Sequence, residues 1–536
     1  STEAKRSIDL LEFNSGVLAA GYEPSEALSS PVVWASQSKV APDFVGSIGS
    51  FEEYVSNTVA LPAYESYLPR PLPLAPANEP DPSNGPGSMV SFDLLTGQET
   101  EASLASTENL PDDFVPGGVG AAAGTVTTEN EVIFTRAFNA LSLVTDPEDF
   151  PWRVNVKVFF SAGSSNFVCS GALVDSSHVM TAGHCVFDYG GVGWVSDVRV
   201  VPAYENGAAF YGEANGVQLH SFTSWTANGD LTYDLGMIDL DRPIGALTGW
   251  FGYGYNTASS FYTDNTFHNP GYPAASPFNG QTMQYWYGDY DSTPTSNEAR
   301  INSLSYGGQS GSNAYQIDSG GGRVVYSVLS HGTDDPGAYT DFVRMTESMF
   351  TSVRDSFIGD DTPATVDLIP MSVQVSPGAL TPGGSLSSLS YLVHNYSSVA
   401  WSGTVSVEVR LSTNNIISTS DTLLETHSFT HSFTSKSTVT INAGSIAIPA
   451  GLSGGSYYVG VILNISDFNT SNNDSSGQEV APLILGSTNF DLAPAAYSGW
   501  DDTLVISTIT GTNTSAGQFT TTDTVFVDLG WANFGT

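Results

Sequence analysis

The pattern of hydrophobic positions divides the chain into an irregular first part and two β-rich parts. Between residues 128 and 360, short runs of Val, Ile, Phe and Tyr alternate with segments rich in Gly, Asn and Asp. Short strands bounded by turn residues are typical of all-β barrels and sandwiches rather than βαβ units. The pattern therefore predicts a mainly β protein. The runs are 154–160, 170–182, 198–204, 235–240 and 323–332.

One segment in this region has a helical period instead. Between residues 340 and 358, apolar residues recur at spacings of three and four, which is the pattern of an amphipathic helix. We expect this helix to end the region. Its apolar face would consist of Phe342, Met345, Met349, Val353 and Phe357.

The second β-rich part shows strict alternation of apolar and polar residues. Segments 402–412, 431–443 and 456–466 each have this period of two, so each would bury one face. The alternation predicts an immunoglobulin-like β-sandwich over residues 361–488. Asp-Leu-Ile-Pro at 367–370 recurs as Asp-Leu-Ala-Pro at 491–494. Residues 489–536 are therefore predicted to begin a second, incomplete copy of the sandwich.

The first part, residues 1–127, is predicted to be largely irregular, with a helix expected only near 51–60. Prolines between residues 71 and 86 disfavour helix and interior strand. Two interpretations remain open: a pro-segment or extended wrap over the next domain, and a disordered tail. The prolines are Pro71, Pro73, Pro76, Pro80, Pro82 and Pro86.

The charge balance narrows the range of partners. The chain has 55 acidic residues but only 15 Lys and Arg residues, which gives a net charge of −40. Nucleic acids and anionic membranes select clusters of Lys and Arg, so neither is an expected partner. No apolar stretch approaches the ~18 to 20 residues that span a bilayer, and membrane insertion is not expected.

The chain contains only two cysteines, Cys169 and Cys185, and the second follows a histidine directly. In an oxidising compartment a disulfide between them would stabilise the fold by about 3 kcal/mol. Two buried free thiols are the alternative.

Three motifs carry groups suited to catalysis. His184 lies in Thr-Ala-Gly-His-Cys directly after an apolar run, where a turn would fix a general base. Asp234 precedes the apolar run 235–240, where burial would keep it paired with an imidazole N–H; a solvated turn is the alternative. Glycines flank Ser310, and the resulting tight turn could direct the N–H groups of Gly308 and Ser310 at an oxyanion. A flexible Gly/Ser loop is the alternative there.

Together these motifs resemble the chymotrypsin-like serine peptidases over residues 128–360. Gly-Gln-Ser-Gly-Ser at 308–312 is similar to the bacterial V8-type, or glutamyl endopeptidase, branch. The resemblance implies a double β-barrel in which Ser310 attacks a peptide carbonyl, His184 transfers the proton and Asp234 orients His184. It implies protein or peptide substrates and no cofactor. No metal is expected either, since the acids in 288–294 and 332–337 lack the spacing of a calcium loop.

Departures from the family pattern bear on activation and specificity. Gln309 stands where the trypsin-like branch has an aspartate that receives a new N-terminus, so an inhibitory first part would have to cover or strain the site. Leu304, where that branch has an acid, disfavours cleavage after Lys or Arg. The V8-type pocket histidine is replaced by Leu329, which leaves His331 as the nearest candidate cation. A preference for Glu or Asp and a preference for small or apolar side chains both stay open. The expected substrate-binding residues are Leu304, Ser305, Tyr306, Ser330, His331 and Gly332.

The second β-rich part resembles the bacterial CARDB adhesion-type domain through its Asp-Leu-Ile-Pro start, the Gly383-Gly384 pair and 411–424. The sequence therefore supports two functional hypotheses. The first is a secreted bacterial serine endopeptidase with appended sandwiches. The second is an extracellular or cell-surface adhesion or filament protein, whose protease-like domain is structural or self-processing and whose sandwiches mediate self-association or surface contact.

Overall fold

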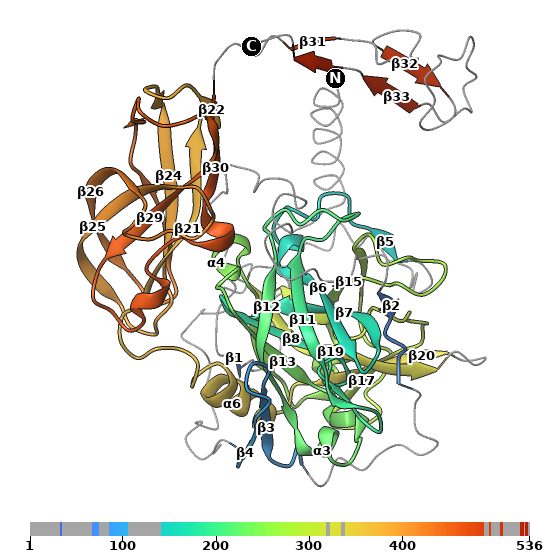
Figure 1. Ribbon diagram of the computed structural model, residues 1–536. Helices are drawn as coiled ribbons and strands as arrows, with labels where there is room; N and C mark the ends of the chain where they lie inside the picture. Colours follow the sequence, from blue (N-terminus) through green and yellow to red (C-terminus); the bar gives the residue numbers. More distant parts are fainter. Residues whose placement is uncertain are drawn as a thin grey trace, which may run out of the picture.

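The computed structural model describes residues 67–73, 85–104, 141–317, 322–333 and 338–486, together with short strands at 33–34, 492–494, 504–507, 526–529 and 531–533. The predicted helix near 51–60 lies outside these residues. The described chain is mainly β, as predicted, with two barrels followed by a sandwich (Figure 1). Within it, every helix is too short or too polar to cross a bilayer.

The first barrel is closed, because strand order β11-β6-β7-β8-β13-β12 is completed by pairing between β11 and β12. Every residue of β6, β8 and β13 is buried, so both faces of these strands are covered by other parts of the protein. The strands are β6 (Asn155–Ala162), β7 (Ser165–Leu173), β8 (His178–Thr181), β11 (Ser196–Pro202), β12 (Ala214–Phe222) and β13 (Gly236–Leu240).

Described residues of the N-terminal part add strands to this barrel. β3 (Met89–Asp93) pairs with β12, and β4 (Glu99–Ala102) pairs with β3 at the edge of the sheet. β2 (Leu68–Pro69) pairs with β7 in the parallel direction. These described residues therefore lie against the first barrel.

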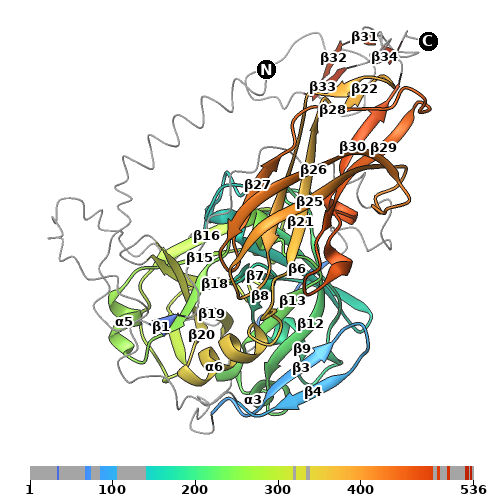
Figure 2. The same cartoon turned by 90° about the vertical axis from the view of Figure 1, so that its left-hand side faces the viewer.

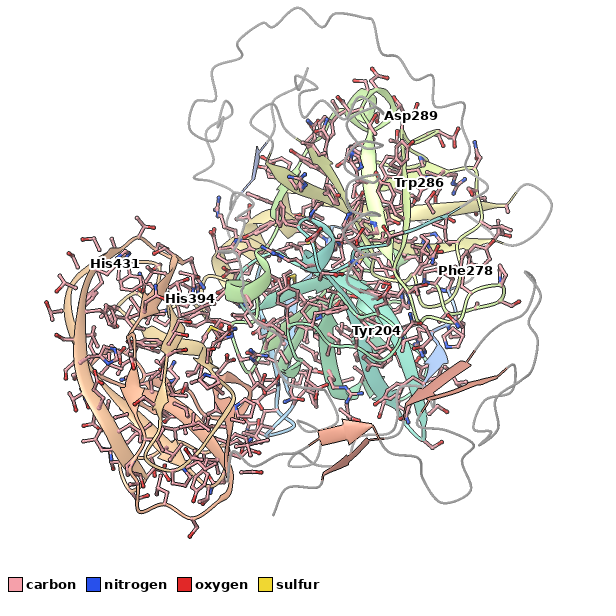
Figure 3. The ribbon with its side chains drawn as sticks, turned by 90° about the horizontal axis from the view of Figure 1, so that it is seen from above. Tyr204, Phe278, Trp286, Asp289, His394 and His431 are labelled. Carbon is pink, nitrogen blue, oxygen red and sulfur yellow. A yellow bond between two sulfur atoms is a disulfide. The ribbon has the colours of Figure 1, made fainter. Side chains whose placement is uncertain are left out.

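The second barrel has the strand order β16-β15-β18-β19-β20-β17. Its core is rich in aromatic side chains, among them Phe261, Tyr290 and Trp286. Figure 3 labels Trp286. β14 (Gly252–Tyr255) joins β19 in parallel, and β1 (Val33–Trp34) pairs with β14. The barrel strands are β15 (Phe267–Gly271), β16 (Gln284–Gly288), β17 (Glu298–Ile301), β18 (Asn313–Ile317), β19 (Arg323–Thr333) and β20 (Tyr339–Arg344).

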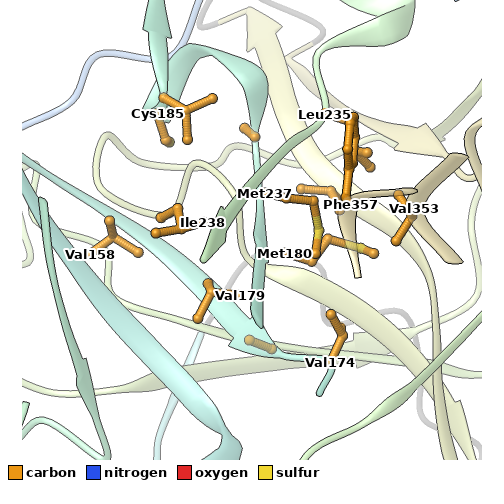
Figure 4. Packing of buried hydrophobic residues seen from close by; sticks show 14 of the residues in the cluster. Val158, Val174, Val179, Met180, Cys185, Leu235, Met237, Ile238, Val353 and Phe357 are labelled. Atoms are coloured by element: carbon orange, nitrogen blue, oxygen red, sulfur yellow. The ribbon is translucent and has the colours of Figure 1, made fainter. Parts of the chain in front are cut away.

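The predicted helix over 340–358 is wrong in its first third. Phe342 lies in β20 and packs in the second barrel core, and helix α6 covers only Glu347–Ser352 before a π-helix, η7, at Val353–Phe357. The helix starts late because residues 340–344 are paired with β17 and β19, and the Thr346 hydroxyl then caps the first turn. The C-terminal half of the predicted face is buried as expected; Figure 4 shows Val353 and Phe357 against the first barrel core.

The sandwich consists of two facing sheets around one core. Alternation along β25 buries Val405, Val407 and Val409 and leaves Thr404 and Ser406 exposed, which matches the predicted period. One sheet contains β21 (Leu368–Ser376), β24 (Ser388–Asn395) and β27 (Thr438–Asn442). The other contains β22 (Ala379–Leu380), β30 (Ala481–Leu485), β29 (Gly455–Asn464), β25 (Trp401–Ser412) and β26 (Thr422–Phe433).

The sandwich packs directly on the first barrel (Figure 2). Met371 and Leu392 of the sandwich join an apolar cluster with Tyr211 and Leu247 of the barrel. A cavity of about 470 Å³ lies in the same interface and is lined by residues from both parts. Polar pairs across this interface include Ser177 with Tyr396 at 2.7 Å, Asp175 with Lys436 at 2.9 Å, and Arg242 with Glu479.

Candidate active site

His184 and Asp234 meet at the ends of two neighbouring strands. His184 lies in a 3-10 turn, Gly183–Cys185, that follows β8, and Asp234 lies two residues before the start of β13. The Nδ1 atom of His184 is 2.7 Å from Oδ2 of Asp234, and the backbone N–H of His184 donates to Oδ1 at 2.7 Å. Both side chains are buried. One carboxylate therefore fixes the histidine ring and its backbone together.

Local constraints hold this turn in place. A Cβ atom on Gly183 would lie 2.8 Å from the Trp225 ring and 2.9 Å from Oδ1 of Asp234, so only glycine permits this approach. A disulfide joins Cys185 to Cys169 on β7, across a sequence separation of 16. The turn that carries His184 is thus covalently attached to the neighbouring strand.

Ser330 makes a contact that the sequence did not reveal. We expected it to line the substrate pocket, but its hydroxyl donates to Oδ2 of Asp234 at 2.6 Å. Burial alone would raise the pKa of Asp234; the charge of His184 and the hydrogen bonds from His184 and Ser330 instead lower it below its ordinary value. The carboxylate is therefore ionised at neutral pH.

The loop that carries Ser310 is seated on the first barrel. Gly308 and Gly311 have φ angles of +95° and +82°, which disfavour other residues. A Cβ on Gly311 would lie 2.1 Å from Oγ1 of Thr181, so the loop approaches β8 as closely as a glycine allows. The N–H of Ser170 donates to the carbonyl of Ser310 at 2.8 Å, and its hydroxyl donates to the carbonyl of Gly308 at 2.8 Å.

The candidate nucleophile and the candidate base each have one atom without a hydrogen-bond partner within the described residues. Oγ of Ser310 and Nε2 of His184 are both buried, and among the described residues neither has a hydrogen-bond partner. In unliganded sites, hydrogen bonds between a nucleophile and its base are often long and tighten only when substrate binds. Nε2 of His184 is therefore available to accept a proton from the Ser310 hydroxyl.

The expected oxyanion donor is occupied by the protein's own chain. The N–H of Gly308 donates to the carbonyl oxygen of Arg70, in the N-terminal part, at 3.1 Å. A peptide carbonyl thus already lies where the sequence predicted an oxyanion to bind.

The expected pocket residues lie on the second barrel beside this loop. The Leu304 side chain is exposed, and the Ser305 hydroxyl accepts a hydrogen bond from Thr340 at 2.9 Å. The ring of Tyr306 packs edge-on against Phe278, which Figure 3 labels. Oε1 of Gln309 accepts from the N–H of Tyr306 at 2.8 Å, so the position that holds an acid in the trypsin-like branch makes a neutral contact here.

His331 lies behind this pocket among acidic groups. Its Nδ1 atom is 3.0 Å from the Ser330 hydroxyl, and its Nε2 atom is 3.5 Å from Glu298 and 3.4 Å from Asp341. Burial is the main cause that lowers the pKa of His331, to about 4. A neutral imidazole that faces two carboxylates does not present a cation to a substrate.

Two groups of described side chains have the proximity of metal ligands. Glu298, His331 and Asp341 form one group, and Asp341 in it already receives two hydrogen bonds of 2.7 Å from Arg300. The other group is His184 with the two cysteines, whose sulfurs are bonded to each other and offer no thiolate. In each group, at least one possible ligand is already bonded to another protein group, so neither group is a set of ligands reserved for a metal.

Comparisons with known proteins agree with this geometry. Residues 144–339 match the family model described as Trypsin. The chain is 30% identical over 219 residues to the "Extracellular metalloprotease" of Bacillus subtilis. The aligned residues make up 39% of this chain and 66% of that protein. The chain is 28% identical over 217 residues to the "Glutamyl endopeptidase" of Bacillus licheniformis, covering 40% of this chain and 65% of that one. The chain thus spans slightly less than two thirds of these curated relatives.

Solved structures of similar proteins include the protease Anisep from Arthrobacter nicotinovorans, at 30% identity and a TM-score of 0.34, covering 38% of this chain and 94% of that one. A Glu endopeptidase structure is similar at 20% identity and a TM-score of 0.35, covering 40% and 95%. The family match covers residues of both barrels, so this part of the chain is similar to trypsin-like serine protease domains, and a glutamyl endopeptidase is among its homologues.

Proposed function

We propose that this chain is a serine endopeptidase that hydrolyses peptide bonds with Ser310 as nucleophile, His184 as general base and acid, and Asp234 as the group that orients His184. The observation that carries the proposal is the double contact of Asp234 with the ring and backbone of His184, 2.7 Å each. The Ser310 loop, seated beside it by glycines, supplies the nucleophile.

The reaction follows from these positions. Oγ of Ser310 attacks the substrate carbonyl while Nε2 of His184 takes its proton, and the ionised Asp234 stabilises the resulting imidazolium through Nδ1–H. The N–H groups of Gly308 and Ser310 stabilise the oxyanion. His184 then protonates the leaving amine. In the second half of the reaction, His184 activates a water molecule, which hydrolyses the ester between the acyl group and Ser310 and restores the serine hydroxyl.

Single and double substitutions test this mechanism. Ser310→Ala and His184→Ala should each reduce kcat on an unfolded protein substrate by more than about 10³-fold, and the double variant should lose little more, because the groups act as one unit. Additive losses, or undiminished hydrolysis by folded Ser310→Ala protein, would contradict the proposal.

For specificity, we propose cleavage after small or apolar side chains rather than after Glu or Asp. The surroundings of His331 support this choice, since burial lowers the pKa of its imidazole to about 4 and leaves it without a positive charge for an acidic side chain. Digestion of a proteome-derived peptide library tests it by identifying the residue before each cut. A predominance of Glu or Asp would instead support the acidic alternative, and a predominance of Lys or Arg would contradict the assignment of Leu304.

We further propose that the protein is secreted by a bacterium and that the CARDB-like sandwich mediates self-association. The disulfide and the extracellular relative support secretion. β26, 12 residues long, is the outer strand of its sheet among the described residues, and such an edge can pair with another chain. Size-exclusion chromatography with light scattering should find oligomers that Thr426→Pro disperses; a monomeric wild-type protein would overturn this part.

A further inference from the structure

Residues 67–73 cross from the first barrel to the second and contact the loop that carries Ser310. The buried Tyr67 ring packs edge-on against Phe159 of the first barrel at 5.1 Å, whereas Leu72 packs against the core of the second. Between these ends, a Cβ on Gly307 would lie only 2.9 Å from the carbonyl oxygen of Arg70. The segment therefore lies tightly against the loop that carries Ser310.

Three backbone hydrogen bonds set the direction of the segment. The N–H of Arg70 donates to the carbonyl of Val168 on β7 at 3.1 Å, and its carbonyl accepts from Gly308 at 3.1 Å. Farther along, the carbonyl of Pro73 accepts from Gly332 at 3.5 Å. The segment thus runs from β7, past the oxyanion donor, to the pocket side.

A substrate must run the opposite way if the proposed function holds. Its acyl half has to lie over the pocket of 304–306 and 330–332, because that pocket holds the residue before the cut. Its leaving amine must lie near His184, which the disulfide places next to β7. From N- to C-terminus, a substrate would therefore pass from Gly332 toward Val168.

The reversed direction explains how the segment could block the site without being cut. The carbonyl of Arg70 uses the N–H of Gly308 that an oxyanion would need. The nitrogen bonded to this carbonyl belongs to Pro71, on the pocket side. The Pro71 nitrogen therefore points away from His184. His184 cannot protonate this nitrogen, and without that proton the Arg70–Pro71 bond is not cleaved.

The side chain of Arg70 anchors the segment. Its Nη2 atom is 2.6 Å from Oδ1 of Asp188, and its guanidinium lies 5.2 Å from the centre of the Phe167 ring. Asp188 follows the His184 turn in β9 (Phe187–Asp188), and its Oδ2 also accepts from the N–H of Val192 at 3.3 Å. A charge-assisted bond together with an aromatic face is a typical guanidinium site.

We propose that Asp188 and Phe167 form a subsite for an arginine side chain beside the catalytic groups, and that Arg70 fills it to hold residues 67–73 across the cleft as a reversed, uncut inhibitor. The inhibitory effect rests on the proposed function, whereas the subsite does not. Peptides or proteins with an arginine that can reach Asp188 are the ligand class.

Hydrogen exchange tests the subsite without requiring activity. In full-length protein that carries Ser310→Ala, the Gly308 amide should be protected, and adding Arg70→Ala or Asp188→Ala should speed its exchange roughly ten-fold. Arg354→Ala, which removes an arginine paired with Asp355 on the surface, is the matched control and should leave this exchange unchanged. Equal protection of Gly308 in all variants would overturn the subsite.

Labelling by a fluorophosphonate tests inhibition in the chain that retains Ser310. Arg70→Ala should react with the probe at least roughly ten-fold faster than wild type, and Arg354→Ala at the wild-type rate. Equal, rapid labelling of all three would overturn inhibition and leave the proposed function standing. Altered Gly308 exchange without any labelling would support the subsite and contradict the proposed function instead.

Discussion

The hydroxyl of Ser330 donates a 2.6 Å hydrogen bond to Oδ2 of Asp234, the same oxygen that contacts Nδ1 of His184. Ser330 lies on β19 of the second barrel, whereas Asp234 belongs to the first. This bond therefore links the two barrels at the carboxylate that orients the proposed general base. It gives the Ser330 side chain a positioning role beside Asp234.

Ser330→Ala should lower kcat by about ten-fold or more, with little change in KM, because a hydrogen bond to a charged group contributes ~1.5 to 3 kcal/mol. The lost bond should also raise the pKa of Asp234, since Ser330 helps to lower it. Steady-state kinetics over a range of pH would measure both effects.

Ser327→Ala is the matched control for this change. Ser327 lies on the same strand and is equally buried, but its hydroxyl bonds to Tyr290 at 2.6 Å, away from the catalytic groups. Ser327→Ala should lower the free energy of unfolding without a selective loss of kcat. Equal kinetic losses in the two variants would show that Ser330 acts only through the stability of β19.

Removing the disulfide should destabilise the first barrel. Replacing Cys169 and Cys185 with Ala opens a loop of 16 residues, and such a loop is expected to cost about 3 kcal/mol of unfolding free energy. Because Cys185 follows His184, we also expect activity to be lost at lower urea concentrations. Urea denaturation monitored by fluorescence and by hydrolysis would measure the change, and an unchanged midpoint would contradict it.

The contact between Lys436 and Asp175 should stabilise the packing of the sandwich on the barrel. Both side chains are largely buried and lie 2.9 Å apart. Lys436→Met leaves Asp175 without this cation and should reduce the unfolding free energy by about 3 kcal/mol, whereas Lys436→Arg should retain most of it. Identical midpoints for the Met and Arg variants in urea denaturation would refute a role for the charge.

His178, on β8 at the same interface, should make stability fall in alkaline solution. Burial alone would lower its pKa, but Asp239, Asp175 and Asp361, all within 3.7 Å, raise it to about 10. The folded state then holds a proton that the unfolded chain releases near its ordinary value, so the stabilisation is complete below about pH 6.5 and disappears as the pH approaches 10.

Between pH 7 and 9, the unfolding free energy should therefore fall by about 1 kcal/mol per pH unit from this group. Asp367 and Asp361 titrate below this pH range. Burial raises the pKa of Asp367 to about 6. Contact with His178 outweighs the burial of Asp361 and lowers its pKa to about 2. Urea denaturation at both pH values would measure the slope, and His178→Gln should flatten it. The same slope in the variant would assign the effect to other groups.

The sequence motifs single out His184 and Asp234 beside apolar strands and Ser310 between glycines, and the structure brings His184 and Asp234 into contact. Contacts between distant segments were not predictable in this way. Nothing local marks the bond between Ser330 and Asp234 or the path of residues 67–73, since both depend on how the barrels pack. The start of the last helix was placed too early because Phe342 fits a helical spacing and a strand equally well, and only its pairing with β17 decides.

The most direct test is to react the folded full-length protein with a fluorophosphonate and to locate the adduct by mass spectrometry, both in the wild type and in the Arg70→Ala variant. We expect one adduct, on Ser310, that forms faster in Arg70→Ala than in the wild type and is lost when His184→Ala is added. An adduct on another residue, no adduct in folded Arg70→Ala protein, or undiminished labelling of Ser310 when His184→Ala is added would contradict the proposed mechanism.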